Sequence, residues 1–381
     1  VVTYSGTGST QNISHNLGSV PGMILVKRTD STASWNVYHR GLNGGTNPEQ
    51  YGINLNTTGA EFSSSGYWSN TAPTSTQFTV GTSSNANDSG GSYVAYLFAH
   101  NNNDGGFGPN QDQDIIKCGT CSGETGSNRD IDLGFEPQFI ITKAVDTTGD
   151  WRLLDTMRGF RGGDVSSSNP NYRLEPNTSD AESIDDTLYI KPNGFYVNGL
   201  PGSGDYIYMA IRRGPLAQPT SATNVFAVDS ESTTSPTPPS YNSGFPVDMF
   251  LSRRDVTATD SWYLYDRLRK SDVALTTNST AAESTVGGTY SEFDRNDGIG
   301  SYTGTVYSNK AYGWMWKRAP GYFDVVAYTG TGSATTVNHN LGVAPEMIWV
   351  KDRDNANDWK VYHKDLGTLA DSGEPAWKYE L

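Results

Sequence analysis

Cysteine is scarce in this chain, and the two cysteines leave little room for redox or zinc chemistry. Among 381 residues they occur only as Cys118 and Cys121, in a Cys-Gly-Thr-Cys sequence. Redox pairs with this spacing lie where a strand meets a helix, whereas Gly, Thr and Ser flank this one. A zinc site would need two more thiols or imidazoles nearby. We therefore expect two small buried or paired side chains within a hairpin.

Basic residues and long apolar runs are also scarce. Lys and Arg total 27 against 41 Asp and Glu, which gives a formal net charge of −14. This charge opposes binding to phosphate backbones and anionic lipid heads, so we expect neither nucleic acid nor a membrane surface as partner. No apolar run reaches the roughly 18 residues of a membrane span, which predicts no membrane insertion. Because the chain starts at Val1 without a signal-peptide pattern, we expect it to be part of a longer or processed polypeptide.

Helical periodicity and catalytic motifs are missing as well. Only residues 153–158 and 264–269 show even a turn or two of helical pattern. The sequence contains no Gly-x-Ser-x-Gly elbow, phosphate loop or His-Glu-x-x-His zinc motif. A glycosidase needs only two carboxylates, but nothing singles out such a pair among the acidic residues. We expect no enzymatic activity.

What the chain does contain is a sequence stated four times. Each copy has a Pro, then a short apolar run, then a Trp that lies 14 positions after the Pro, or 16 in the third copy. The four pairs are Pro21 with Trp35, Pro137 with Trp151, Pro246 with Trp262, and Pro345 with Trp359. The Trp positions are 116, 111 and 97 residues apart. A period of about a hundred residues is that of a small domain rather than of a solenoid, so each copy is expected to bury its own core.

Many short apolar and aromatic runs, separated by turn residues, predict an all-β fold of tandem antiparallel β-sandwich modules, with a jelly-roll-like topology as one form. The expected boundaries are 1–100 for module 1, 114–213 for module 2, 224–319 for module 3 and 322–381 for module 4. Module 4 is incomplete, because the later strands of the other modules have no counterpart after His363. Half a sandwich cannot bury its inner face, so we expect further polypeptide or another chain to complete it.

Histidine recurs within the repeat, in pairs 24 residues apart. The pairs are His15 with His39 in module 1 and His339 with His363 in module 4; near these positions modules 2 and 3 have Asp132 and Ser243 at the first, and Asp155 and Asp266 at the second. Two imidazoles are half of a metal site. Because modules 2 and 3 lack both histidines, we expect the histidines of modules 1 and 4 to form hydrogen bonds within loops rather than to bind a metal.

Acidic residues recur in the turns before the tryptophans. Module 4 has three carboxylates within seven residues, those of Asp352, Asp354 and Asp358. Calcium favours several oxygens from one loop, which makes this the one candidate metal site. Turn formation by Asp explains the same residues without an ion. Apart from calcium at this site, we expect no cofactor.

Aromatic residues outside the repeated strands are candidates for glycan contact. Tyr67, Trp68, Tyr196 and Tyr290 fall in loop-rich regions. Sugars stack on such rings, and neighbouring acid or amide groups supply hydrogen bonds. The alternative is that the rings cap the cores of the modules.

The repeated sequence resembles a known domain. The motifs that carry the resemblance are Tyr-x-Gly-x-Gly at 4–8, His-Asn-Leu-Gly-x-x-Pro-x-Met-Ile-x-Val-Lys at 15–27, Trp-x-Val-Tyr-His at 35–39, Leu-Asn-x-Thr at 55–58 and Tyr-x-Ala-Tyr-Leu-Phe-Ala at 93–99. They are similar to a repeated domain in large structural proteins of marine bacteriophages, notably cyanophages. Modules 1 and 4 match closely, and modules 2 and 3 loosely.

The resemblance implies a virion protein, part of a tail fibre or similar appendage that contacts the host surface, and it supplies no catalytic residues. The expected partners are other virion proteins, a further copy of the chain in a homo-oligomer, and a host surface glycan or protein; the expected location is the extracellular virion. Two alternatives stay open. One is a capsid-decorating or appendage-assembly protein without receptor contact, and the other is a carbohydrate-active enzyme on the appendage.

Overall fold

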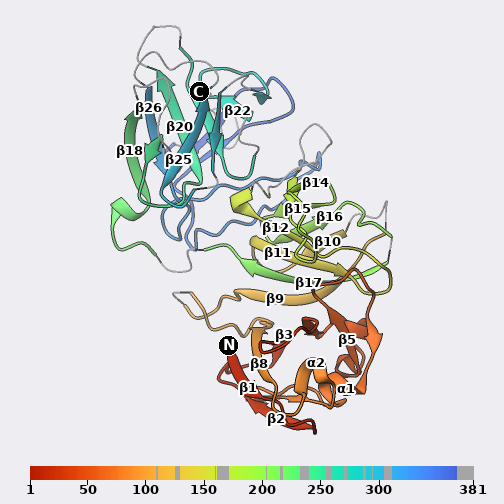
Figure 1. Ribbon diagram of the computed structural model, residues 1–381. Coiled ribbons are helices and arrows are strands. Elements are labelled where there is room, and N and C mark those ends of the chain that lie inside the picture. The colour runs from red at the N-terminus through yellow and green to blue at the C-terminus, as the bar shows by residue number, and fades with distance from the viewer. Residues whose placement is uncertain are drawn as a thin grey trace. The chain divides into compact units, whose positions relative to one another are not determined.

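The fold is nearly all β (Figure 1). The structure is a computed structural model that describes residues 1–108, 110–124, 129–158, 160, 171–202, 204–214, 218–231, 240–254, 260–269, 273–285, 289–293, 295–303 and 311–366. Among these, the α-helices are α1 (Ser65–Trp68) and α2 (Ser84–Asn87), and neither is long enough to cross a membrane. The short 3-10 helices are η1 (Leu42–Gly45), η2 (Pro48–Gln50), η3 (Thr156–Arg158) and η4 (Ala222–Asn224). The prediction of an all-β chain is confirmed, while the jelly-roll-like sandwich stays a prediction.

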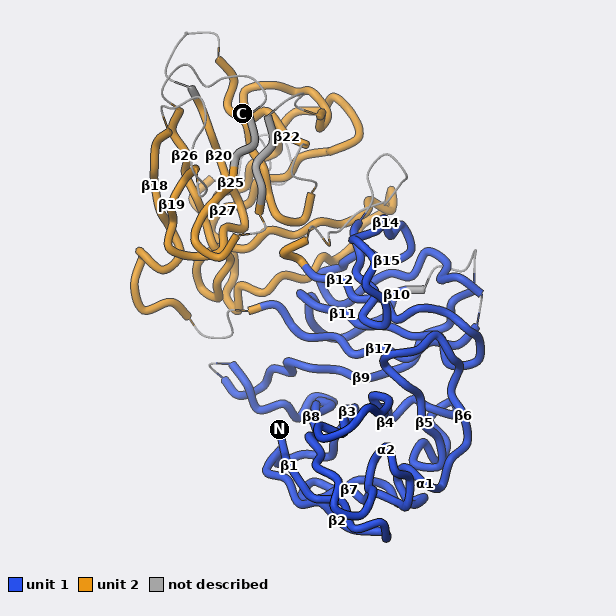
Figure 2. The backbone as a smooth tube through the Cα atoms, in the orientation of Figure 1, with its two compact units in different colours: residues 1–155, 164–213 blue, residues 156–163, 214–381 orange. Residues whose placement is uncertain are grey.

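The chain forms two compact units (Figure 2). Unit 1 comprises Val1–Asp155 and Asp164–Arg213, and unit 2 comprises Thr156–Gly163 and Gly214–Leu381. Predicted modules 1 and 2 therefore fall almost wholly in unit 1, and modules 3 and 4 in unit 2. The finer module boundaries stay predictions.

Module 1 is built on a six-stranded antiparallel sheet. Its strands, in spatial order, are β1 (Val2–Ser5), β8 (Ser92–Ala99), β3 (Pro21–Arg28), β4 (Asn36–His39), β5 (Tyr51–Asn54) and β6 (Phe62–Ser63). A second pair, β2 (Gln11–Ser14) and β7 (Gln77–Val80), covers one face with the two helices. The apolar run of β3 lies in the middle of the sheet, and its side chains are buried on both faces, Ile24 and Val26 in one cluster and Met23 in another. Ile24, Val26, Trp68, Phe78 and Tyr93 form the core between these layers.

Module 2 repeats the central part of that sheet. β12 (Arg152–Asp155), β11 (Pro137–Ala144), β17 (Asp205–Arg212) and β9 (Ile116–Ser122) form one sheet, β10 (Arg129–Asp132), β16 (Gly194–Val197) and β15 (Leu188–Lys191) a second, and β13 (Asn171–Arg173) with β14 (Ser183–Asp185) a third. The pairing of β11 with β17 shifts register after Pro137, as that of β3 with β8 does after Pro21. Proline has no N–H to donate to a ladder, so the repeated proline fixes the same irregularity in both modules.

The large sheet of module 3, in unit 2, has the strand order of the module 1 sheet. β18 (Phe226–Glu231), β26 (Ala311–Trp316), β20 (Met249–Arg254), β21 (Tyr263–Asp266), β22 (Val273–Thr276) and β23 (Ser284–Thr285) form its large sheet, beside β19 (Tyr241–Asn242), β25 (Gly298–Thr303) and β24 (Thr289–Glu292). Tyr241, Phe250, Tyr265 and Met315 lie in its core. Module 4 contributes the hairpin of β27 (Met347–Val350) and β28 (Lys360–His363) among the described residues.

The turn before each repeated strand is also repeated. A glycine two or three residues before the proline has positive φ in all four copies: Gly18 at 78°, Gly134 at 71°, Gly244 at 75° and Gly342 at 70°. Only glycine adopts this conformation without strain. The four sequence copies are therefore structural copies at this turn.

Candidate functional site: a docking interface used twice

Two of the four repeated tryptophans join one module to another. Trp151 of module 2 is 1% exposed, and its Nε1 donates a hydrogen bond of 3.0 Å to the carbonyl of Asn54, the last residue of β5 in module 1. Trp359 of module 4 is 3% exposed, and its Nε1 donates at 3.1 Å to the carbonyl of Thr276, the last residue of β22 in module 3. We call Trp151 and Trp359 the docking tryptophans. Since β5 and β22 hold the same place in their sheets, the two contacts are equivalent.

A lysine makes a second repeated contact. The ammonium of Lys143 donates to the carbonyls of Ala144 at 2.8 Å and of Thr58 in module 1 at 3.3 Å. The ammonium of Lys351 donates to the carbonyls of Asp352 at 3.0 Å and Thr280 in module 3 at 3.1 Å. Thr58 and Thr280 each lie four residues after the acceptor of the docking tryptophan. Burial lowers the pKa of Lys143 to about 8, and Asp150 and Asp146 partly offset this.

The backbone supplies a third repeated contact. The N–H of Glu61 donates to the carbonyl of Val145 at 2.7 Å, and the N–H of Glu283 to the carbonyl of Arg353 at 2.9 Å. The glutamates occupy equivalent positions, but their side chains differ. Glu283 pairs with Arg353 at 2.8 Å, whereas Glu61 accepts from the N–H of Asn43 and has its pKa raised by burial. The docking geometry is thus held mainly by backbone and ring contacts, which tolerate different side chains nearby.

Apolar side chains close the interface. In unit 1 one buried cluster combines Met23, Val37, Leu42 and Ile53 of module 1 with Ile116, Cys118, Ile141, Val145, Trp151, Ile207 and Met209 of module 2. In unit 2 the corresponding cluster is Met249, Leu264 and Leu275 of module 3 with Trp359. In addition to any core of its own, each module therefore shares a core with its neighbour. Burial of a large apolar side chain is worth about 1.5–3 kcal/mol, so the shared core is a substantial part of the stability of a unit.

The comparisons with known proteins follow the same division. The domain of unknown function DUF7483 matches residues 1–215 and 231–373. The chain belongs to this family. The two matched stretches of the DUF7483 family coincide closely with units 1 and 2, so each spans a docked pair of modules. No curated protein and no solved structure matches the chain.

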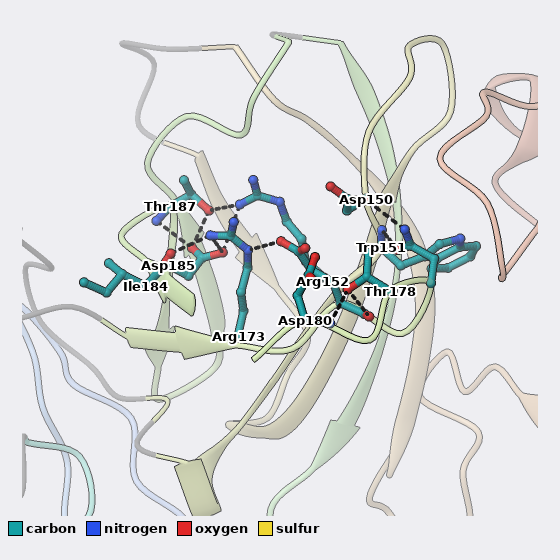
Figure 3. A network of polar contacts seen from close by, with 11 residues as sticks. Asp150, Trp151, Arg152, Arg173, Thr178, Asp180, Ile184, Asp185 and Thr187 are labelled. Atoms are coloured by element: carbon teal, nitrogen blue, oxygen red, sulfur yellow. Dashed lines mark hydrogen bonds and ion pairs between the residues drawn. The ribbon is translucent and has the colours of Figure 1, made fainter. Parts of the chain in front are cut away.

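A polar network supports β12, the strand that directly follows the docking tryptophan of module 2 (Figure 3). The guanidinium of Arg152 donates to the fully buried carboxylate of Asp185 at 2.9 Å and to Thr187 at 3.2 Å. Arg173 lies 3.7 Å from the same carboxylate. A buried carboxylate needs such partners, because an uncompensated buried charge is strongly destabilising. The network therefore fixes β12, whose first residue follows Trp151 directly.

Three of the repeated tryptophans each donate their backbone N–H to the side chain of an asparagine. The N–H of Trp35 donates to Oδ1 of Asn56 at 2.8 Å, that of Trp151 to Asn177 at 2.8 Å, and that of Trp262 to Asn278 at 3.1 Å. This contact was not predicted from the sequence. The recurrence of Asn-Thr or Asn-Ser after each Trp was the pattern that could have revealed it.

The predicted loop role of the histidines is confirmed. Nδ1 of His15, Oδ1 of Asp132, Oγ of Ser243 and Nδ1 of His339 each accept the N–H of the residue two positions on, at 3.2, 2.8, 3.2 and 3.3 Å. His39, Asp266 and His363 do the same at the second position, at 3.0, 3.0 and 3.2 Å. Imidazole, carboxylate and hydroxyl interchange because each presents an acceptor close to the backbone.

His39 also belongs to the docking interface of unit 1. Its Nε2 lies 3.0 Å from the carbonyl of Tyr208 in module 2. Because Nδ1 accepts the N–H of Gly41, Nε2 carries the proton and the ring is neutral. Burial lowers the pKa of His39 to about 4. His100 accepts the N–H of Cys118 at 3.2 Å, and burial likewise lowers its pKa to about 4.

Two of the predicted glycan residues lie in the core. Tyr67 is 8% and Trp68 2% exposed, because α1 turns both rings toward Phe62 and Tyr38. They are therefore not the surface platform that their loop-rich surroundings suggested. A helix of four residues leaves no periodic pattern from which its burial could be predicted.

The other two predicted glycan residues are Tyr196 in unit 1 and Tyr290 in unit 2. Tyr196 is half-buried, stacks on Tyr189 with ring centroids 4.6 Å apart, and has the ammonium of Lys191 5.2 Å from its ring. Tyr290 lies on β24, and its side chain is outside the described residues. Of the three predicted rings whose side chains the structure describes, Tyr67 and Trp68 are buried and Tyr196 is partly exposed.

The predicted calcium residues form a turn. The carboxylate of Asp352 accepts from the N–H groups of Asp354 at 2.9 Å and Asn355 at 3.2 Å and from the amide of Asn357 at 2.7 Å. Hydrogen bonds, that of the Asn355 amide first, lower the pKa of Asp352. Asp358 lies 3.7 Å from the ammonium of Lys360. In the described part of the chain no three His, Cys, Asp or Glu side chains form a group that could hold a metal, so calcium stays a hypothesis from sequence alone.

Both cysteines are buried, and they form no disulfide with each other. Both lie on β9, three residues apart, so they point to opposite faces of the strand. Burial raises the pKa of Cys118 to about 12. A thiol that stays protonated is a poor nucleophile, and Cys118 serves as a packing residue of the shared core.

Proposed function

We propose that this chain is a structural protein of a bacteriophage virion and forms part of a tail fibre or similar appendage that contacts the host cell surface. The observation that supports this proposal is the repeated docking interface, in which Trp, Lys and Glu make the same three contacts in both units. The sequence resemblance to repeated domains of marine phage structural proteins points in the same direction.

Docked pairs suit an appendage for a mechanical reason. Independent domains on short linkers move relative to one another by default, unless their interface is large and apolar. In unit 1 eleven buried side chains form one shared cluster, which makes the pair a single body. An appendage built from such pairs keeps its reach while its loops remain available for contact. Its partners are other virion proteins, further copies of the chain, and a host glycan or protein.

The first experiment locates the protein and tests adhesion. Antibodies against the purified chain are applied to intact virions, and the labelled chain is added to host cells before phage adsorption is measured. We expect appendage labelling, saturable cell binding and reduced adsorption. A heat-denatured chain serves as the control for non-specific attachment.

Each outcome has a definite meaning. Antibody labelling without cell binding would contradict host contact and identify a capsid-decorating or assembly component. Absence from the virion would contradict the proposal as a whole.

A further inference from the structure

The two remaining repeated tryptophans have surroundings different from those of the docking pair. Trp35 of module 1 and Trp262 of module 3 are half-buried, and we call them the platform tryptophans. The Trp35 ring stacks on Tyr96 at 6.2 Å with an interplanar angle of 28°. The Trp262 ring lies 5.3 Å from Trp314 at 37°. Tyr96 and Trp314 are equivalent residues, because they pair with Leu25 and Leu251 at the same register of β3 and β20.

A cation adjoins each platform. The ammonium of Lys27 lies 6.0 Å from the centroid of the Trp35 ring, and the guanidinium of Arg253 lies 5.1 Å from that of Trp262. Both cations stand two residues after the leucine that pairs with the second ring. Ring pair and cation therefore recur together in units 1 and 2.

An amide donor completes the set. Asn56 and Asn278 use Oδ1 to hold the backbone of the platform tryptophans, and both side chains are exposed. Nothing within the described ranges accepts a hydrogen bond from Nδ2 of either residue. In module 2, by contrast, Nδ2 of Asn177 donates to Asp150 at 2.7 Å. The amide is therefore occupied at Trp151, which docks, and available at Trp35 and Trp262, which stay partly accessible.

We propose that each platform binds a pyranose ring of a surface polysaccharide. The ring would lie on the platform tryptophan, while the cation and the amide donate to its hydroxyl or carboxylate oxygens. Flat aromatic faces beside a few well-placed donors are the usual chemistry of sugar recognition. The inference deepens the proposed function, since it names a glycan as the host component.

The size of the platform favours a sugar over a protein. A stable protein interface covers about 800 Å² on each partner, whereas a whole aromatic side chain offers only about 150–250 Å². Two partly exposed rings fit one or two sugar units. Binding at one such site is weak, and two platforms on one chain raise the affinity for a polymer that reaches both.

The test measures binding of the full chain to immobilised surface polysaccharide purified from a cyanobacterial host, by surface plasmon resonance. We expect Trp35→Ala or Trp262→Ala to weaken binding about tenfold and the double variant to abolish it, because loss of one of two linked sites removes avidity. Trp349→Ala is the matched control, since Trp349 is 40% exposed and belongs to neither platform. It should bind like the unchanged chain.

A second variant separates recognition from folding. Asn56→Asp keeps an oxygen for the Trp35 N–H but replaces the donor amide, so thermal stability should persist while binding falls. Equal binding by the double tryptophan variant and the unchanged chain would overturn the inference. So would self-association that depends on Trp35 and Trp262 without polysaccharide binding. If virions carry the protein but the chain binds no polysaccharide, this inference fails and the structural role remains.

Discussion

The docking and platform tryptophans occupy the same position of the repeat and make different contacts. Trp151 and Trp359 are almost fully buried against a neighbouring module, whereas Trp35 and Trp262 are half-buried against a ring of their own sheet. In module 2 the residue equivalent to Tyr96 is Met209, which lies in the shared core. We infer that an aromatic residue on the closing strand of a module (β8, β17 or β26) keeps the tryptophan ring on its own sheet, and that a flexible methionine there lets the ring pack against the neighbouring module.

The comparison shows that modules with the same repeated sequence can have different roles at the docking interface. In the tryptophan and lysine contacts modules 1 and 3 are the acceptor modules and modules 2 and 4 supply the donors, whereas in the backbone contacts Glu61 and Glu283 of modules 1 and 3 donate. Such asymmetry closes each pair and directs assembly, because two acceptor modules cannot dock with each other.

The largest expected effect is that of Trp151→Ala. It removes a ring from the shared core and leaves the Asn54 carbonyl without its donor, so we expect a loss of about 3–5 kcal/mol in the free energy of unfolding. Trp35→Ala should cost about 1–2 kcal/mol, since that ring is partly hydrated. Urea unfolding, with hydrogen exchange of peptides from each unit, measures both. Equal losses of unfolding free energy for the two variants would contradict the distinction between docking and platform tryptophans.

Acid should loosen the docked pair of unit 1 through His39. The neutral ring is favoured in the folded chain, so its contribution is complete above the ordinary pKa of 6.5 and is lost as pH falls toward about 4. Because the pKa falls from 6.5 to about 4, the full loss is about 3 kcal/mol. Half-buried His100 should add a smaller loss in the same direction. Hydrogen exchange of unit 1 between pH 7 and pH 4 records the effect.

The matched variant is His39→Asn. Asparagine keeps an acceptor for the Gly41 N–H, as Asp266 does for Leu268 in unit 2, but does not titrate. Acid sensitivity of unit 1 should fall in this variant. Unchanged sensitivity would show that other groups dominate the response.

Local features of the fold were accessible from sequence, whereas the docking was not. The Pro-to-Trp spacing and the short apolar runs predicted the repeated strands, and the exchange of His15 for Asp132 and Ser243 predicted a loop contact. Both depend on residues close together along the chain. Docking joins Trp151 to Asn54, 97 positions away, and depends on which module faces which. The one local difference in sequence that accompanies docking is the closing-strand residue, which is Met209 in module 2 and Tyr96 in module 1.

A smaller effect is expected for the asparagines. Asn177→Ala leaves the partly buried N–H of Trp151 without an acceptor and frees Asp150, which should cost about 1–3 kcal/mol. Asn56→Ala should cost less than about 1 kcal/mol, because water can replace Oδ1 at the exposed N–H of Trp35. Paired thermal unfolding of the two variants checks the order. A greater loss of stability for Asn56→Ala would mean that the asparagine hydrogen bond matters more at the platform tryptophan Trp35 than at the docking tryptophan Trp151.

The smallest change in stability is expected for Tyr96→Met, which gives module 1 the closing-strand residue of module 2. The substitution removes a ring pair worth about 0.5–1.5 kcal/mol but supplies a side chain that packs well, so we expect a net loss below about 1 kcal/mol. The Trp35 ring should become mobile and more accessible, which quenching of its fluorescence by iodide measures against the same chain with Trp35→Phe. Unchanged quenching would mean that Lys27 and the hydrogen bond from the Trp35 N–H to Asn56 are enough to hold the ring. In that case the aromatic partner would not determine whether a repeated tryptophan stays on its own module or docks on a neighbour.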